Sequence, residues 1–327
     1  MKTPPSIVIV VLTLALLAAP LGAGGQTAGN VPHVGIIHYS GEMHLWVDGL
    51  RQGLRELGLQ EGKQLVLDIR EINYDLKAVE AAASDLERAH VDLLYTVTTS
   101  VTTAAKRATA HVPIVFFAGT DPVSAGLVES LARPGGRLTG VHTRTMDLTA
   151  KRLEILKEMI PKLSRVVTFY DPDMAISRES ARVTREVAQQ LGVQVVERQV
   201  RSIEELRRGL QALKPREVDA YFETTDPMVN SQAQLIIDAA RVNKLPTMFY
   251  EHSPVVNGGL AGYGENFPEI LRLSAKYVQR ILTGTPPRDL PVENYDRIEF
   301  ALNLHTAREI GLPIPPAVRY RANTVIE

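Results

Sequence analysis

Short apolar runs alternate along this chain with stretches of helical periodicity, and this alternation constrains the fold more than any other feature. The runs have the length and β-branched content of buried strands. The first four lie at 34–37, 65–69, 93–97 and 114–117. Between the first two, apolar residues recur with a period near 3.6, as at Val47, Leu50 and Leu54. Strand, helix and strand in this order predict a parallel sheet with crossover helices.

A second series of the same kind follows a pause at 134–136 (Pro-Gly-Gly). Its expected strands lie at 166–170, 193–197, 220–223 and 247–250. Roughly 300 residues exceed what one hydrophobic core usually serves, so two units are expected. Two doubly wound α/β halves form a cleft at the carboxyl ends of their strands, where such sheets bind ligands. We therefore expect the functional site in that cleft.

The N-terminus has the order of a secretory signal. Lys2 precedes an uncharged run at 7–19, and small residues follow at 22–25. This pattern predicts a cleaved signal peptide at 1–25 and a periplasmic location. The run is shorter than the ~20 residues of a membrane-spanning helix, which disfavours the alternative of an uncleaved anchor. The chain contains no cysteine, so disulfides, a thiolate nucleophile and a lipidated cysteine are excluded.

Charge and motifs exclude several classes of function. The 36 basic and 37 acidic residues give no electrostatic footprint for nucleic acid or anionic lipid. The sequence contains no nucleophile elbow, phosphate loop or dinucleotide fingerprint, so we predict no catalytic residue and no cofactor. His38, Glu42 and His44 form the only local cluster resembling metal ligands, but their spacing matches no zinc motif. No metal site is predicted.

Hydroxyl side chains gather where the third strand ends, at 96–103 (Thr-Val-Thr-Thr-Ser-Val-Thr-Thr). A helix is expected to begin there, and its N-terminus presents unpaired N–H groups and a positive dipole end. A ligand carboxylate or phosphate is therefore expected at Thr99 and Ser100, with Thr98 beside them. The alternative is that one hydroxyl caps the helix and the others face water.

An Asp-Pro pair follows a strand at three places, namely at Asp121, Asp171 and Asp226. One interpretation is that each carboxylate caps the next helix while proline takes its first position. The other is that a carboxylate pairs with a ligand ammonium. Asp226 is the best candidate for the second role, because the helix after it is expected to start late, near Ser231.

Further candidates lie at the ends of other strands. Ser40 and Glu42 follow the first strand and are expected to face the cleft, while Tyr170 and Glu251 complete the set of predicted ligand contacts. Trp46 comes soon after Glu42 in the first expected helix. It is interpreted as packed in the core, with stacking on a ligand as the alternative.

Several motifs resemble a known family. They are GLRELG at 53–58, EGK at 61–63, VPIVF at 112–116, TDPVSAGLV at 120–128, LARPGG at 131–136, LTGV at 138–141, ILTG at 281–284 and GLPIP at 311–315. They extend over nearly the whole chain after the signal. Together they are similar to the ABC-transporter substrate-binding proteins of the tryptophan-receptor-like group.

The resemblance implies a type I periplasmic binding fold, in which two doubly wound parallel-sheet lobes are joined by a hinge of three crossings. The crossings are expected near His142, Tyr250 and Glu299. One lobe would then comprise residues 31–142 plus 251–298, and the other 143–250 plus 299–327.

Some relatives hold an amino-acid carboxylate at positions matching Thr99 and Ser100 and at a loop matching Gly119 and Thr120. Their ammonium partner corresponds to Asp226. This chain departs from the pattern at Pro227, where many relatives carry asparagine, and at Met174, where a polar residue is common. The resemblance therefore implies a small-molecule site and leaves the class of ligand open.

We predict a monomeric receptor that binds a small molecule, closes about its hinge and delivers the ligand to a membrane permease, its only membrane contact. An exported α/β enzyme using the same cleft is the main alternative. A transcription regulator's effector lobe has a similar fold, but the export signal and the lack of a helix-turn-helix segment disfavour it.

Overall fold

The structure is a computed structural model that describes residues 31–214 and 217–327. The signal peptide predicted at 1–25 lies outside these residues. Within the described part, no helix combines the length and apolar character needed to cross a membrane.

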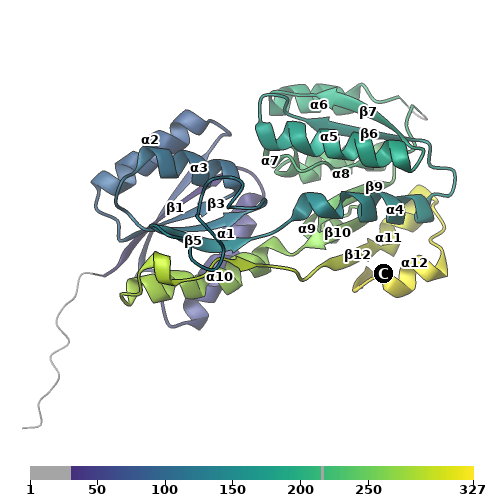
Figure 1. Ribbon diagram of the computed structural model, residues 1–327. Coiled ribbons are helices and arrows are strands. Elements are labelled where there is room, and N and C mark those ends of the chain that lie inside the picture. The colour runs from purple at the N-terminus through teal and green to yellow at the C-terminus, as the bar shows by residue number, and fades with distance from the viewer. Residues whose placement is uncertain (1–30, 215–216) are drawn as a thin grey trace, which may run out of the picture. The chain divides into compact units, whose positions relative to one another are not determined.

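Six parallel strands form the first sheet, in the order β11-β5-β4-β3-β1-β2 (Figure 1). Its first four predicted strands are confirmed, with small shifts at their ends. The strands are β1 (His33–Tyr39), β2 (Val66–Ile72), β3 (Leu93–Val97), β4 (Ile114–Ala118), β5 (Leu138–His142) and β11 (Glu293–Asn294).

Four helices cover this sheet, with α2 and α3 on one face and α1 and α10 on the other (Figure 1). They are α1 (Met43–Glu56), α2 (Leu76–Arg88), α3 (Thr99–Ala108) and α10 (Phe267–Leu282). A short 3-10 helix, η2 (Pro287–Asp289), follows α10. Since α10 comes from a distant part of the sequence, one face of the first sheet is covered only after the chain has returned from the second sheet.

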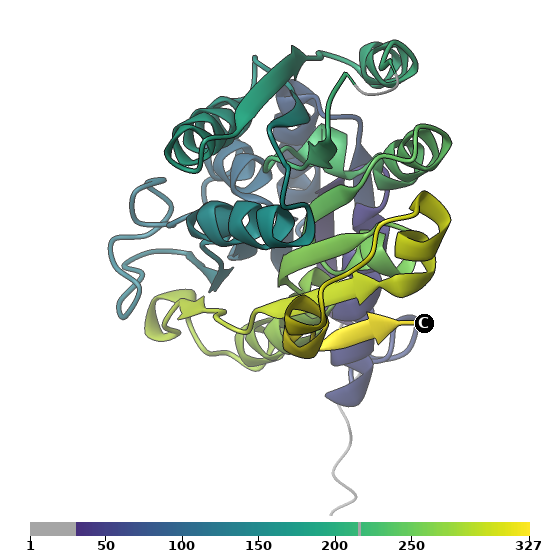
Figure 2. The same ribbon diagram turned by 90° about the vertical axis from the view of Figure 1, so that its right-hand side faces the viewer.

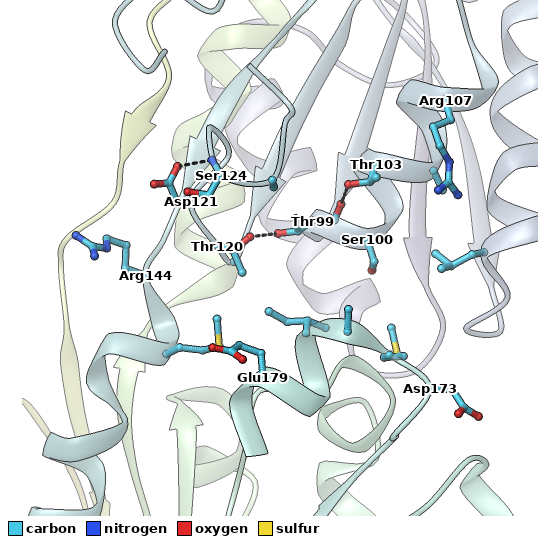
Figure 3. A pocket seen from close by; sticks show the side chains of 18 of the residues that line it. Thr99, Ser100, Thr103, Arg107, Thr120, Asp121, Ser124, Arg144, Asp173 and Glu179 are labelled. Carbon is cyan, nitrogen blue, oxygen red and sulfur yellow. Dashed lines mark hydrogen bonds between the residues drawn. The ribbon is translucent and has the colours of Figure 1, made fainter. Parts of the chain in front are cut away.

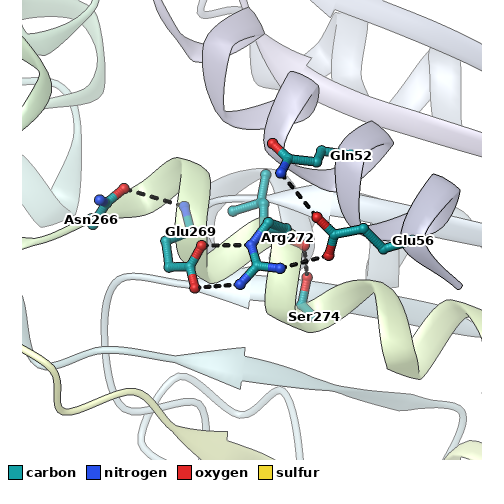
Figure 4. A network of polar contacts seen from close by, with 7 residues as sticks. Gln52, Glu56, Asn266, Glu269, Arg272 and Ser274 are labelled. Atoms are coloured by element: carbon teal, nitrogen blue, oxygen red, sulfur yellow. Dashed lines mark hydrogen bonds and ion pairs between the residues drawn. The ribbon is translucent and has the colours of Figure 1, made fainter.

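Helices α1 and α10 approach closely because α1 presents glycine to its partner. A Cβ atom on Gly53 would lie 2.1 Å from the backbone oxygen of Arg272. At the edge of this contact, Arg272 donates to Glu56 at 2.6 Å and to Glu269 at 2.6 and 2.7 Å (Figure 4). Asn266 caps α10 by accepting from the Glu269 N–H. These contacts fix the point at which α10 begins.

Seven strands form the second sheet, in the order β13-β12-β10-β9-β8-β6-β7. β12 runs antiparallel to β10, the other pairs are parallel, and β13 forms the edge beside β12 (Figure 2). The strands are β6 (Arg165–Tyr170), β7 (Gln194–Gln199), β8 (Ala220–Phe222), β9 (Thr247–Glu251), β10 (Ala261–Glu265), β12 (Glu299–Asn303) and β13 (Thr324–Ile326).

The helices associated with the second sheet follow the predicted alternation. They are η1 (Thr145–Leu148, a 3-10 helix), α4 (Thr149–Met159), α5 (Ala175–Gln190), α6 (Ile203–Gln211), α7 (Pro227–Asn230), α8 (Ala233–Val242), α9 (Ser253–Val256), α11 (Leu304–Ile310) and α12 (Pro316–Arg321). The two sheets have largely separate apolar cores, although Tyr250 of β9 and Met174 pack on the core of the first sheet and Tyr74 also packs on a core of the second. The predicted class, two doubly wound α/β units, is confirmed.

The chain passes between the sheets three times, after β5, after β10 and between β11 and β12. The second crossing was expected near Tyr250, and that position is wrong. Strand β10 pairs with β9 and β12, so the chain leaves the second sheet only after Glu265. The segment 251–265, assigned from the sequence to the first lobe, therefore belongs with the second sheet.

Candidate functional site

Two adjacent cavities are lined by loops of the first sheet and of the second sheet. The outer cavity has a volume of about 760 Å³ and opens to solvent, and the deep cavity beside it has a volume of about 50 Å³. Five residues line both, namely Thr99, Ser100, Gly119, Thr120 and Ile176. Figure 3 shows the outer cavity with the hydroxyls of Thr99, Ser100 and Thr120 on one side and Glu179 on the other.

The start of α3 supplies the polar rim of both cavities. Thr98 is the N-cap and accepts from the Val101 N–H at 3.5 Å. Thr99 Oγ1 lies 2.9 Å from Thr120 Oγ1, and Ser100 Oγ lies 3.1 Å from the Tyr39 hydroxyl. A hydroxyl can both donate and accept, so these groups stay available to an anionic ligand beside the positive end of the helix dipole. Thr98 lines only the deep cavity.

Four aromatic side chains line the deep cavity, which we call the aromatic chamber. The rings of Trp46 and Phe267 have their centroids 4.4 Å apart, Phe117 and Phe267 5.4 Å, and Tyr250 and Phe267 5.9 Å. All four side chains are at most 4% exposed. The chamber therefore offers an apolar, π-rich surface next to the hydroxyl rim.

The second sheet contributes Thr145, Ile176, Thr225 and Pro227 to the aromatic chamber. Thr225 Oγ1 is buried and has no hydrogen-bond partner among the described residues. Sequence reasoning considered Trp46 but missed these four residues, as well as Phe117, Tyr250 and Phe267. One usable signal was that Thr145 follows the predicted crossing at His142.

Asp226 lines neither cavity, contrary to its expected place in the cleft. It is completely buried; its Oδ1 accepts from the Val229 N–H at 2.9 Å and its Oδ2 from the Asp171 N–H at 2.7 Å. Burial raises the pKa of Asp226, and the two backbone donors oppose that shift. The structure thus has the capping arrangement, with Pro227 at the first position of α7.

The other two Asp-Pro carboxylates also accept backbone N–H groups. Asp121 accepts from Val123 at 2.8 Å, and Asp171 accepts from Asp173 at 2.8 Å. Asp121 additionally lines the outer cavity. All three carboxylates thus accept backbone N–H groups, but only Asp226 caps a helix: no helix begins between 119 and 137, and the N-cap of α5 is Met174.

Four other predicted contacts line neither cavity, namely Ser40, Glu42, Tyr170 and Glu251. The Ser40 hydroxyl donates to Asn73 at 2.5 Å, and the Tyr170 hydroxyl donates to Glu197 at 3.0 Å. A ligand role for these residues stays a prediction. In residues 31–214 and 217–327, no group of three or more candidate ligands is arranged to hold a metal ion.

Buried acidic groups lie behind the chamber. Glu223 is fully buried and Glu251 is 3% exposed. Glu251 Oε1 accepts from Asn230 at 2.7 Å, whereas its other oxygen and one oxygen of Glu223 have no partner in the described part of the chain. Burial raises the pKa of Glu251 to about 8, and the nearby carboxylates of Glu42 and Glu265 add to the shift.

Replacing Glu251 with glutamine should change how stability depends on pH. Between the ordinary pKa of 4.5 and about 8, the unfolded chain ionises Glu251 while the folded protein keeps it protonated. Its contribution to folding stability is therefore complete below the lower value and is lost as pH rises toward the upper one. The difference in Tm, Glu251→Gln minus wild type, should rise between about pH 5 and about pH 8. Thermal melts across this range test it, with the exposed Glu186→Gln as control. A constant difference would contradict the raised pKa.

The two doubly wound sheets, the three crossings and the cavities between them define a binding protein of the type I periplasmic fold. Comparison with known sequences identifies the family within this class of binding protein. The profile of the family described as ABC transporter substrate binding protein matches residues 34–326, and the chain belongs to this family. The resemblance recognised in its sequence motifs is thereby confirmed. The family consists of solute-binding proteins rather than enzymes.

Individual relatives agree with this assignment. A tyrosine-binding protein from Clostridioides difficile is 27% identical over 266 residues, which cover 81% of this chain and 76% of that protein. A conserved domain protein from Vibrio cholerae superposes with a TM-score of 0.81 at 28% identity, over 90% of this chain and 99% of that one. A domain from Streptococcus pneumonia, solved in complex with L-Trp, shares the fold with a TM-score of 0.79 at 24% identity, with the same coverage.

Proposed function

We propose that this chain is the extracytoplasmic receptor of an ABC importer and that it binds an aromatic amino acid of the tyrosine type between its two sheets. One observation carries the proposal: the aromatic chamber adjoins the hydroxyl-lined start of α3 at Thr99 and Ser100. This pair of surfaces matches an aromatic side chain joined to a carboxylate. The similarity to a tyrosine-binding protein supports the same class of ligand.

In this proposal the ligand carboxylate lies at the rim formed by Thr99, Ser100 and Thr120, and its ring enters the aromatic chamber. The chamber of about 50 Å³ accommodates only a few water molecules. It must widen to take a ring, so binding is coupled to movement of the two sheets about the three crossings. Residues 1–25 direct export and are then removed, and the mature protein acts as a monomer in the periplasm and passes its ligand to a permease.

Titration with L-tyrosine tests the proposal. We expect calorimetry to detect stoichiometric binding, and the emission of Trp46, the chain's single tryptophan, to change as the ring enters the chamber. Ser100→Ala removes one rim hydroxyl and should weaken binding about tenfold, the equivalent of ~1.4 kcal/mol. L-Leucine and D-tyrosine serve as comparison ligands. No binding of any aromatic amino acid by protein freed of co-purified ligand would overturn the assignment.

A further inference from the structure

Arg152 carries a buried charge that is not part of the surface of the binding site. It lies in α4, is 1% exposed and lines neither cavity. Its Nη2 donates to the Thr145 backbone oxygen at 3.0 Å and to the Thr149 hydroxyl at 3.1 Å, and its Cζ lies 5.9 Å from the centroid of the Tyr250 ring. A cation over an aromatic face at this distance is attracted to it.

The environment of Arg152 is acidic. Burial lowers its pKa to about 10, and the carboxylates of Glu265 and Glu223 act in the opposite direction. The guanidinium therefore stays charged at neutral pH. Its Nε and Nη1 have no hydrogen-bond partner among the described residues. Burying a charge costs free energy unless the groups around it are held in place to compensate it. A residue that only filled space would not need a charge at this position.

Arg152 contacts two residues that line the aromatic chamber, on the side facing away from the cavity, and these residues belong to separate elements of the chain. Thr145 of η1 and Tyr250 of β9 both line the aromatic chamber. The Thr145 hydroxyl also donates to Glu265 at 3.2 Å, at the end of β10. Phe267, another part of the wall, follows two residues later as the first residue of α10. Arg152 is thus connected to the first two crossings between the sheets.

A line of rings leads from Arg152 to the far side of the chamber. The Tyr250 ring meets Phe267 edge to face, and Phe267 packs on Trp46 of the first sheet's helix α1. A shift of Tyr250 therefore changes the surroundings of Trp46. This gives the role of Arg152 an optical readout that does not require ligand.

We propose that Arg152 is a positioning residue for the ligand site. From behind the wall it orients Thr145 and Tyr250, and through the bond from Thr145 to Glu265 it links this wall to the crossing before Phe267. The effect on affinity rests on the proposed function, whereas the effect on the chamber wall does not.

Two substitutions separate positioning from structural support. Arg152→Lys keeps the charge but loses the planar group that contacts Thr145, Thr149 and Tyr250 together. Arg152→Met keeps much of the apolar stem but removes the charge and leaves the buried carboxylates of Glu265 and Glu223 without their counter-charge, a change that lowers stability. Arg182→Met, on the exposed face of α5, is the matched control.

We expect both Arg152 variants to fold, to bind L-tyrosine at least tenfold more weakly than wild type, and to show a shifted Trp46 emission without ligand. Arg152→Lys, which keeps the buried charge, should do so with a Tm close to that of wild type, whereas Arg152→Met should have a lower Tm. Weak binding at a retained Tm in Arg152→Lys marks a positioning role. Arg182→Met should leave affinity and emission unchanged. Affinity within twofold of wild type together with unchanged emission, or failure of both variants to fold, would overturn the proposal. If wild type does not bind tyrosine, the proposed function fails, and the ligand-free Trp46 emission still decides the role of Arg152.

Discussion

Replacing Asp226 with alanine is expected to lower the free energy of unfolding by about 3 kcal/mol. Loss of the α7 cap contributes ~1 kcal/mol, and leaving the partly buried Asp171 N–H without its acceptor adds ~1 to 3 kcal/mol. Both bonds are short, and the side chain is completely buried. Because Asp226 lines neither cavity, affinity for L-tyrosine should stay within about threefold of wild type, equivalent to ~0.7 kcal/mol. Denaturant unfolding and calorimetry on the same variant measure the two effects.

Asp226→Asn is the matched control, since asparagine is a good cap and its amide oxygen can still accept from Val229. Its NH₂ group cannot accept from Asp171, so we expect an intermediate loss of stability. A different pattern would restore the ammonium-binding role predicted from the sequence. In that case Asp226→Ala would lose about a hundredfold or more in affinity, ~3 kcal/mol, because the ligand's charge would be left unpaired.

The order of strands and helices could be predicted because buried parallel strands are continuous apolar runs that stand out between periodic helices. Strand β10 could not be predicted in this way. Its sequence, Ala-Gly-Tyr-Gly-Glu, lacks β-branched residues, and its glycines serve a close approach between backbones instead. A Cβ on Gly264 would lie 1.8 Å from the Tyr250 backbone oxygen. The position of the second crossing followed from this packing rather than from any local pattern.

The residues of the candidate site differ in the same way: some have a local sequence signal and others are brought together only by packing. Thr99 and Ser100 were predictable, because helix starts at the carboxyl ends of parallel strands have local sequence signals, whereas Gly119 and Thr120 were expected from the family resemblance. The aromatic chamber was not predictable from such signals. Tyr250 and Phe267 read as ordinary core residues, and only the return of the chain through α10 brings them against Trp46. Asp226 carried a real signal, but the same Asp-Pro pattern fits a cap and a ligand contact equally well.

Replacing Gly119 with leucine, whose side chain would occupy the ligand site, is expected to abolish most of the affinity for the ligand. Gly119 follows β4 and lines both cavities, and a Cβ built on it meets no atom within 4 Å. Leucine at this position therefore finds open space in the ligand-free protein but competes with the ligand for it. Overfilled sites typically cost ~1 to 3 kcal/mol, so Gly119→Leu should weaken L-tyrosine binding about 5- to 150-fold.

Stability should change little, because an added Cβ meets no protein atom within 4 Å and Gly119 does not need the left-handed backbone region. Gly136→Leu is the matched control: it lies in an exposed loop outside both cavities, and a Cβ there also meets nothing within 4 Å. Calorimetric titration should separate the two variants, with the control binding as wild type does and Gly119→Ala falling between them. Equal affinity of Gly119→Leu and wild type would show that the ligand binds away from the junction of the two cavities. The rim at Thr99 and Ser100 would then lose its proposed role as well, because it borders the same space.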